Sequence, residues 1–154
     1  GIIGLGRIGS NIAKWFKTCN IDSWEDWDGF GAYSLDDQQQ QLIDNDNVLK
    51  KLNNICKIKK LAILKMKPDT FYPPHVDRYK KCKVNMLLTT SHTSHCCFLN
   101  KDQTTIVHVP YKKNTMYILD TTNLHMVINF NSPRYLFSVL FDNDLTYKGL
   151  AKRV

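Results

Sequence analysis

"NLHMVINFNSPRYLFSVLF" (residues 123–141) consists of two β-rich runs joined by the turn-forming segment "NFNSP". Branched and aromatic residues favour strands, whereas Asn, Ser and Pro favour turns. The pattern therefore predicts a hairpin whose centre lies between Asn129 and Phe130. In that hairpin His125 and Arg134 are directly opposite each other and share one face, with Cβ atoms about 5 Å apart.

Upstream of this segment the chain continues as short β-rich runs separated by turn signals. From residue 58 onward they are "IKKLAILKM", "KVNMLLTT", "HCCFLN", "TTIVHVP", "NTMYILD", "HMVINF" and "RYLFSVLF". Such a series favours a sandwich or barrel over alternating βαβ units. The segments 11–19 and 35–56 instead carry apolar side chains at helical spacing and predict helices that pack against the sheet. We therefore expect a mainly β fold with N-terminal helices.

Length and composition limit the architecture. With 154 residues, 43% of them hydrophobic, the chain can build one domain with a core. We expect a single domain, residues 1–154, with a helical part (1–57), a β core (58–142) and a helical or frayed tail (143–154). No apolar run approaches the roughly 20 residues of a membrane helix, and "GIIGLGRIGS" lacks the basic start of a signal peptide. The five cysteines form no CxxC pair, so the expectation is a soluble, cytoplasmic protein in a reduced compartment.

Two motifs resemble ligand sites but lack the necessary context. "GLGRIG" (residues 4–9) matches the dinucleotide-binding glycine pattern, yet only "GII" precedes Gly4 and the β-rich remainder leaves no room for a doubly wound sheet. We interpret it as a flexible turn into the first helix. "SHTSHCC" (residues 91–97) contains His92, His95, Cys96 and Cys97, but no second cluster completes a four-ligand zinc site. We interpret it as a polar loop followed by the start of a strand.

"PPHVDRYKK" (residues 73–81) places His75 and Asp77 two positions apart where a strand ends. Alternate side chains of an extended chain share a face, so the imidazole and the carboxylate can close on one metal ion. Together with His125 they make a 2-His-1-carboxylate set, which leaves positions on Fe(II) open for a bidentate 2-oxo acid and dioxygen. Arg134 can then pair bidentately with the far carboxylate of that acid.

The order H-x-D, His and Arg resembles that of the Fe(II)/2-oxoglutarate-dependent dioxygenases, especially their aspartyl/asparaginyl β-hydroxylase-like and prolyl-hydroxylase-like members. The resemblance covers about residues 58–142 and implies a double-stranded β-helix (jelly-roll, cupin-like) core buttressed by two or three helices. It implies that His75, Asp77 and His125 ligate Fe(II). It also implies that Arg134 holds the C5 carboxylate of 2-oxoglutarate, with Asn85 helping at the other carboxylate. No tyrosine or arginine stands out in the sequence for that second position.

The same resemblance implies the reaction. A substrate C–H bond would be hydroxylated with dioxygen, and 2-oxoglutarate would be released as succinate and carbon dioxide. Side chains of a protein or peptide are the first expectation for the substrate, because the most similar families act on them. A small anionic molecule comes next.

The net charge of +7 raises the chance of an acidic partner or of nucleic acid, but lysines that keep exposed strand edges soluble are the commoner reason for such a balance. We expect a basic rim around the site from Arg78, Lys80, Lys81, Lys83, Lys112 and Lys113. Nucleic acid ranks lower as a substrate, because no arginine follows Arg134 until Arg153. Two alternatives of other classes stay open: a non-catalytic cupin-like sandwich that binds a metal or a partner, and a basic nucleic-acid-binding module. In the second alternative the H-x-D pattern is accidental: His75 is then an ordinary packed or hydrogen-bonded histidine, and Asp77 forms a turn ion pair with Arg78.

Overall fold

The computed structural model describes residues 2–7, 10–18, 30–78, 81–89, 94–102, 104, 106–142 and 145–154. Within those stretches, no helix has the length and apolar character needed to cross a bilayer.

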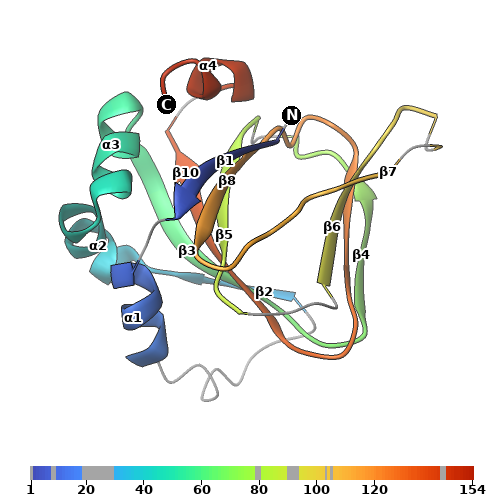
Figure 1. Cartoon of the computed structure of the whole chain (residues 1–154), viewed down its shortest axis with the longest axis horizontal. Coiled ribbons are helices and arrows are strands. Elements are labelled where there is room, and N and C mark those ends of the chain that lie inside the picture. The colour runs from blue at the N-terminus through green and yellow to red at the C-terminus, as the bar shows by residue number, and fades with distance from the viewer. Residues whose placement is uncertain are drawn as a thin grey trace.

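Two antiparallel sheets form the body of the protein (Figure 1). The strand order of the larger one, here the major sheet, is β1 (Ile2–Arg7), β8 (Thr115–Leu119), β5 (Lys83–Leu87), β10 (Arg134–Phe141), β3 (Ile58–Met66) and β2 (Phe30–Ser34). The order of the minor sheet is β4 (Thr70–His75), β9 (His125–Asn129), β6 (Ser94–Leu99) and β7 (Ile106–His108). This is the predicted jelly-roll architecture, without closure into a barrel.

Helices cover the side of the major sheet that faces away from the minor sheet (Figure 1). They are α1 (Ser10–Thr18), the 3₁₀ turn η2 (Asp36–Gln38), α2 (Gln39–Asn45) and α3 (Asn47–Ile55), and a short α4 (Tyr147–Ala151) lies near the C-terminus. Helix α3 begins where the Asp46 carboxylate accepts hydrogen bonds from the backbone N–H groups of Val48 and Leu49, both 3.0 Å long. The predicted helical buttress is thus confirmed.

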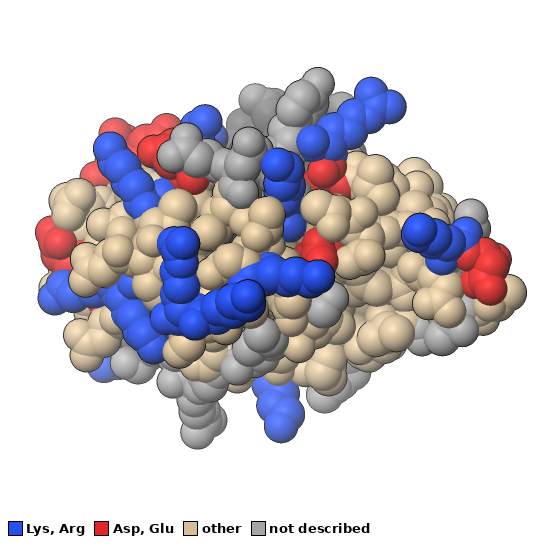
Figure 2. Space-filling model, turned by 90° about the horizontal axis from the view of Figure 1, so that it is seen from above, with Lys and Arg blue, Asp and Glu red and all other residues tan. Residues whose placement is uncertain are grey.

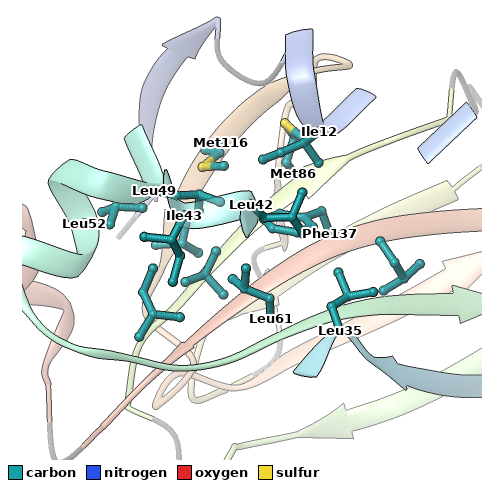
Figure 3. Close-up of a cluster of buried hydrophobic side chains, with 14 of the residues drawn as sticks. Ile12, Leu35, Leu42, Ile43, Leu49, Leu52, Leu61, Met86, Met116 and Phe137 are labelled. Atoms are coloured by element: carbon teal, nitrogen blue, oxygen red, sulfur yellow. The ribbon is translucent and has the colours of Figure 1, made fainter. Parts of the chain in front are cut away.

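The main hydrophobic core lies between these helices and the major sheet (Figure 3). Phe137 of β10, Leu61 of β3 and Leu49 of α3 are all fully buried in it. Side chains of a strand alternate between its two faces, so this packing fixes which residues of β10 point the other way. Those are Arg134, Leu136, Ser138 and Leu140, and all four line a cavity between the sheets.

The strands at 58–66 and 134–141 coincide with the predicted runs, and the tail helix was also predicted. Two strands were missed. The prediction treated residues 1–57 as mostly helical, but β1 and β2 extend the two edges of the major sheet through backbone pairing with β8 and β3. Glycine is depleted in strands, so the glycines within "IIGLGR" and "FGAYS" weaken the strand signal of both segments.

The interpretation of "GLGRIG" as a flexible turn is wrong for its described residues. Gly4 and Arg7 belong to β1 and pair with Tyr117 and Thr115 of β8, with an irregularity between the two pairs. Ile8 and Gly9 lie outside the described residues. The pairing with β8 is antiparallel, so the arrangement differs from the parallel βαβ unit that a dinucleotide fingerprint requires.

The predicted hairpin over residues 123–141 is also wrong. Strand β10 already has a neighbour on each side, β5 and β3, so no edge is left for β9, which joins the minor sheet. The connection crosses between the sheets and is fixed by Asn129, whose buried Nδ2 donates to the carbonyls of Met66 (3.1 Å), Lys67 (2.6 Å) and Ser132 (2.8 Å). His125 and Arg134 therefore lie on opposite sheets rather than side by side.

Candidate functional site

Two histidines face each other across neighbouring strands of the minor sheet. His75 at the end of β4 is the register partner of His125 at the start of β9, and their ring centroids are 4.3 Å apart. Pro73 and Pro74 precede His75 on β4, which is an edge strand. Proline has no backbone N–H to donate, and an edge strand tolerates this because one of its sides has no neighbouring strand. The predicted hairpin would have placed Arg134 opposite His125. In the structure the residue opposite His125 is His75.

The hydrogen bonds of the two rings determine which nitrogen is available. Nδ1 of His75 lies 2.7 Å from the Pro73 carbonyl, and Nδ1 of His125 lies 2.9 Å from the Asn123 carbonyl. A carbonyl only accepts, so each Nδ1 carries the proton and each Nε2 keeps its lone pair. Burial lowers the pKa of His125, although the Asn123 carbonyl acts in the opposite direction. The buried ring is therefore held in the neutral form that binds metals.

Asp77 completes a set of three possible ligands. One ligand atom from each of His75, Asp77 and His125 lies within 4.8 Å of the others, so the set could hold a metal ion. The Asp77 backbone N–H donates to the Thr121 carbonyl (3.0 Å), which ties the segment after β4 to the turn before β9. The spacing of His75 and Asp77 in the sequence had predicted their proximity, and the fold adds His125.

Lys83 of β5 forms an ion pair with Oδ2 of Asp77. The other oxygen, Oδ1, lies 3.9 Å from Nε2 of His75. The lysine thereby orients the carboxylate with one oxygen toward the major sheet and one toward the histidines. The sequence had placed Lys83 only in a general basic rim, because nothing local indicates that it crosses from β5 to Asp77.

Arg134 enters the same cavity from the major sheet. Its side chain is only 4% exposed, and none of the described carboxylates forms an ion pair with it. Its neighbours are neutral: burial raises the pKa of the Cys96 thiol to about 11, and burial likewise raises the pKa of Tyr111. A buried guanidinium without a counter-ion is costly, so this end of the cavity is suited to an anion from outside the chain.

Two more polar groups lie at this end of the cavity. The Asn85 Oδ1 atom and the Tyr111 hydroxyl are buried and meet no described partner at good hydrogen-bond geometry, although the Asn85 side chain lies close enough to Tyr111 to act on its pKa. The guanidinium carbon of Arg134 lies 5.6 Å from the centre of the Tyr111 ring. Buried polar atoms nearly always have well-formed hydrogen bonds, so these two atoms indicate a place for a polar ligand. Asn85 was predicted here, whereas Tyr111 was missed.

A short loop after β7 holds Tyr111 in position. The Tyr117 hydroxyl donates to the Pro110 carbonyl (2.8 Å) and accepts from the backbone N–H of Lys112 (3.1 Å). The rings of Tyr111 and Tyr117 meet edge to face, with centroids 5.2 Å apart. Tyr111 lies outside any strand period, so the sequence offered only its place after a proline as a signal.

All five predicted site residues line one cavity of about 350 Å³ between the sheets. These residues are His75, Asp77, Asn85, His125 and Arg134. The other described histidines and most of the described rim residues lie elsewhere. His95 and His108 share a hydrogen bond of 3.1 Å with each other, and His92 and Lys80 lie outside the described residues. Among the other proposed rim residues Lys83 lines the cavity, whereas Lys112 and Lys113 do not.

Comparison with known proteins identifies the fold. No protein-family model matches the chain, and no curated protein sequence matches it. HygX from Streptomyces hygroscopicus, solved with nickel and 2-oxoglutarate bound, is similar over 90% of this chain and 81% of its own, with a TM-score of 0.65 and 10% identity. SnoN, a non-heme α-ketoglutarate-dependent epimerase from nogalamycin biosynthesis, is similar over 93% and 78%, with a TM-score of 0.64 and 11% identity.

A 2OG-Fe(II) oxygenase family oxidoreductase from Burkholderia pseudomallei is matched over 55% of this chain and 43% of that one, with a TM-score of 0.47 and 14% identity. This chain thus spans less than half the length of that protein, and so partial a likeness supports no argument. The similarities to HygX and SnoN, which extend over most of each chain, show that this chain has the same jelly-roll fold as those two proteins. The aspartyl/asparaginyl or prolyl hydroxylase subtype has no such support.

Proposed function

We propose that the protein is an Fe(II)- and 2-oxoglutarate-dependent oxygenase, with residues 1–154 forming a single domain. One observation carries this proposal. A 2-His-1-carboxylate set shares a cavity with a buried arginine that has no carboxylate partner among the described residues. The first group suits Fe(II) and the second suits the far carboxylate of a 2-oxo acid. A non-catalytic metal-binding sandwich would not require a buried arginine beside the metal ligands.

The residues present fit the metal and the cosubstrate. His75, Asp77 and His125 would hold the iron through two Nε2 atoms and Oδ1. Arg134 would bind the C5 carboxylate of 2-oxoglutarate, and the Tyr111 hydroxyl would donate a hydrogen bond to the same molecule. Asn85 would contribute through its Nδ2 donor, because its Oδ1 only accepts. The cavity carries the positive charges of Arg134 and Lys60, while Lys83 balances Asp77. An excess of positive charge suits a dicarboxylate.

The chain's own contribution to the reaction is geometry. When bound, iron and 2-oxoglutarate supply the oxidising chemistry, with release of succinate and carbon dioxide. The Pro73 and Asn123 carbonyls keep both Nε2 atoms aimed at one point, and Lys83 keeps one Asp77 oxygen directed toward them. Apolar Leu136, Val127 and Leu64 line the cavity and limit the water beside the reacting atoms.

Hydroxylation of a C–H bond is the reaction we propose. The substrate would be either a small molecule or the side chain of a peptide. Support for a small molecule comes from HygX, which has this fold and has been solved with hygromycin B bound, at a TM-score of 0.65 and 11% identity. Nucleic acid is the weaker choice, because the predicted basic rim does not assemble around the cavity: Lys112 and Lys113 line no part of it.

Anaerobic absorption spectroscopy tests the proposal. Addition of Fe(II) and then 2-oxoglutarate under argon is expected to produce a broad, weak charge-transfer band in the visible region, because the 2-oxo acid chelates the iron. Admission of air is then expected to release succinate slowly, even without substrate. Absence of both the band and succinate at saturating cosubstrate would refute the proposal and favour a non-catalytic sandwich.

Replacement of Tyr111 by phenylalanine removes only the hydroxyl, which meets no described partner at good hydrogen-bond geometry. We expect the affinity for 2-oxoglutarate to fall by about tenfold or more, because a hydrogen bond to a charged group is worth ~1.5–3 kcal/mol. We expect the free energy of unfolding without ligand to stay equal or to rise, since a buried unsatisfied hydroxyl is lost. Titration of the band and thermal unfolding measure the two effects.

Tyr147→Phe is the matched control, because Tyr147 lies on α4 and lines neither this cavity nor the Tyr111 loop. Its affinity for 2-oxoglutarate should equal that of the parent. A Tyr111→Phe variant that loses stability but binds 2-oxoglutarate normally would assign the hydroxyl a structural role instead.

A further inference from the structure

A second cavity, of about 370 Å³, lies beside the proposed active site. Three lysines line it, Lys59, Lys60 and Lys81, together with the apolar side chains of Leu140, Phe141 and Leu145. Its volume is within the range of roughly 300–1,000 Å³ typical of small-molecule sites. The apolar residues would contact a ligand's body, and the amines would contact a charged group on it.

One pair of residues joins the two cavities. Lys60 of β3 and Leu140 of β10 are partners in the strand register, and each lines both cavities. Along β10 the same inner face carries Leu140, Ser138, Leu136 and finally Arg134. A molecule bound beside Lys60 would therefore extend into the cavity that contains the metal set, approaching it from the end opposite Arg134.

No Asp or Glu is among the described residues that line the second cavity. Its remaining residue, Cys82, is neutral: burial and the nearby Asp120 carboxylate raise the pKa of the thiol to about 12. The Asp120 carboxylate accepts a 2.6 Å hydrogen bond from the Thr122 hydroxyl. Lys59 and Lys60 form no ion pair with any residue that the structure describes.

Lysine and arginine side chains are also common on one face of the molecule, with Asp and Glu among them. Figure 2 shows Lys and Arg side chains spread over the left and middle of the face seen from above. Solvated lysines alone would explain an exposed face. They do not explain why Lys60 is half-buried beside a cavity whose described lining residues include no acid.

We propose that this second cavity binds an oxyanion of the substrate, most simply a phosphate, and so directs the rest of that substrate toward the metal set. The inference rests on the proposed function and narrows its substrate to small molecules that carry a phosphate-like group. Lysine ammonium groups bind phosphate as point charges, and several around one cavity favour a doubly charged group over a single carboxylate.

Inorganic phosphate is the probe, measured by calorimetry at low ionic strength on protein loaded with Ni(II) and 2-oxoglutarate. Under these conditions the cosubstrate occupies Arg134, which leaves the second cavity for phosphate. The Lys59→Gln/Lys60→Gln variant is expected to raise the Kd of phosphate by about tenfold, because it removes two charges that are partly screened by water. Lys60→Gln alone should weaken phosphate binding as well.

The control is Lys50→Gln/Lys113→Gln, which removes the same charge from exposed positions outside both cavities. Its phosphate Kd should change by less than about twofold. Equal weakening in the two double variants would overturn the proposal, because the effect would then reflect net charge alone. Acetate that binds as tightly as phosphate would overturn the preference for a doubly charged group.

Two results separate this inference from the proposed function. If phosphate competes with 2-oxoglutarate and depends on Arg134 but not on the lysines, the second cavity is not an oxyanion site, although the oxygenase assignment stands. If the charge-transfer band never forms while phosphate binding still depends on the lysines, the oxygenase assignment fails, and with it the claim that the oxyanion belongs to an oxygenase substrate.

Discussion

Arg134→Gln is expected to weaken the binding of 2-oxoglutarate by roughly 100-fold, because the loss of a buried, hydrogen-bonded charge contact costs ~2–5 kcal/mol. Arg134 is buried, and no described carboxylate competes for it, so its whole hydrogen-bonding capacity is available to a ligand. Metal affinity should stay within about twofold of the parent's, because the three candidate ligands come from other residues.

Stability provides an independent measurement for the same variant. Without ligand, Arg134→Gln should unfold at the same or a higher temperature, since a buried charge without a counter-ion has been removed. The rise in melting temperature that 2-oxoglutarate produces in the parent should then disappear. A variant that is less stable and still responds to 2-oxoglutarate would show that Arg134 serves the fold.

Two further variants calibrate the result. Arg134→Lys keeps the charge but loses the planar fork, so its affinity should lie between those of the parent and Arg134→Gln. Arg153→Gln removes an exposed charge in the last residues of the chain and should bind 2-oxoglutarate like the parent. If Arg134→Gln itself stays within twofold of the parent, the anion must bind elsewhere.

The sequence predicted the strands well where both faces are buried or alternate clearly. Strands β3 and β10 have the predicted ends because long runs of branched and aromatic residues stop at turn-forming residues. The pairing of β9 with β10 could not be decided in this way. A tight turn and a crossing between sheets both begin with "NFNSP", and the choice depends on which edges the other strands have already occupied.

The site shows the same division between local and long-range information. The proximity of His75 and Asp77 was predicted because side chains two positions apart in one extended segment lie on the same face. The placement of Tyr111 depends on a loop held by Tyr117, and Lys60 reaches the cavity only because Leu140 is its neighbour on β10. These residues have ordinary local sequences, so only the assembled sheets identify them.

The metal set provides the other large effect. His75→Ala, Asp77→Ala and His125→Ala are each expected to lower Fe(II) affinity by at least about 100-fold, since loss of a group that only supports a ligand already costs roughly 10–100-fold. The reason is convergence: both Nε2 lone pairs and Asp77 Oδ1 are directed to one region, and two ligands alone cannot hold the ion there. Anaerobic dialysis against Fe(II), followed by metal analysis, measures the loss.

His95→Ala and His108→Ala are the matched controls, because these two histidines lie on the same sheet but bind each other. Their iron content should equal that of the parent. Asp77→Asn adds a separate test of the carboxylate, since it keeps the shape, removes the charge and leaves Lys83 without its counter-ion. Loss of iron in this variant without unfolding would show that the negative charge itself is required. If all three alanine variants retained iron while His95→Ala lost it, the metal would bind on β6, and the cavity between the sheets would have to bind its anion without a metal.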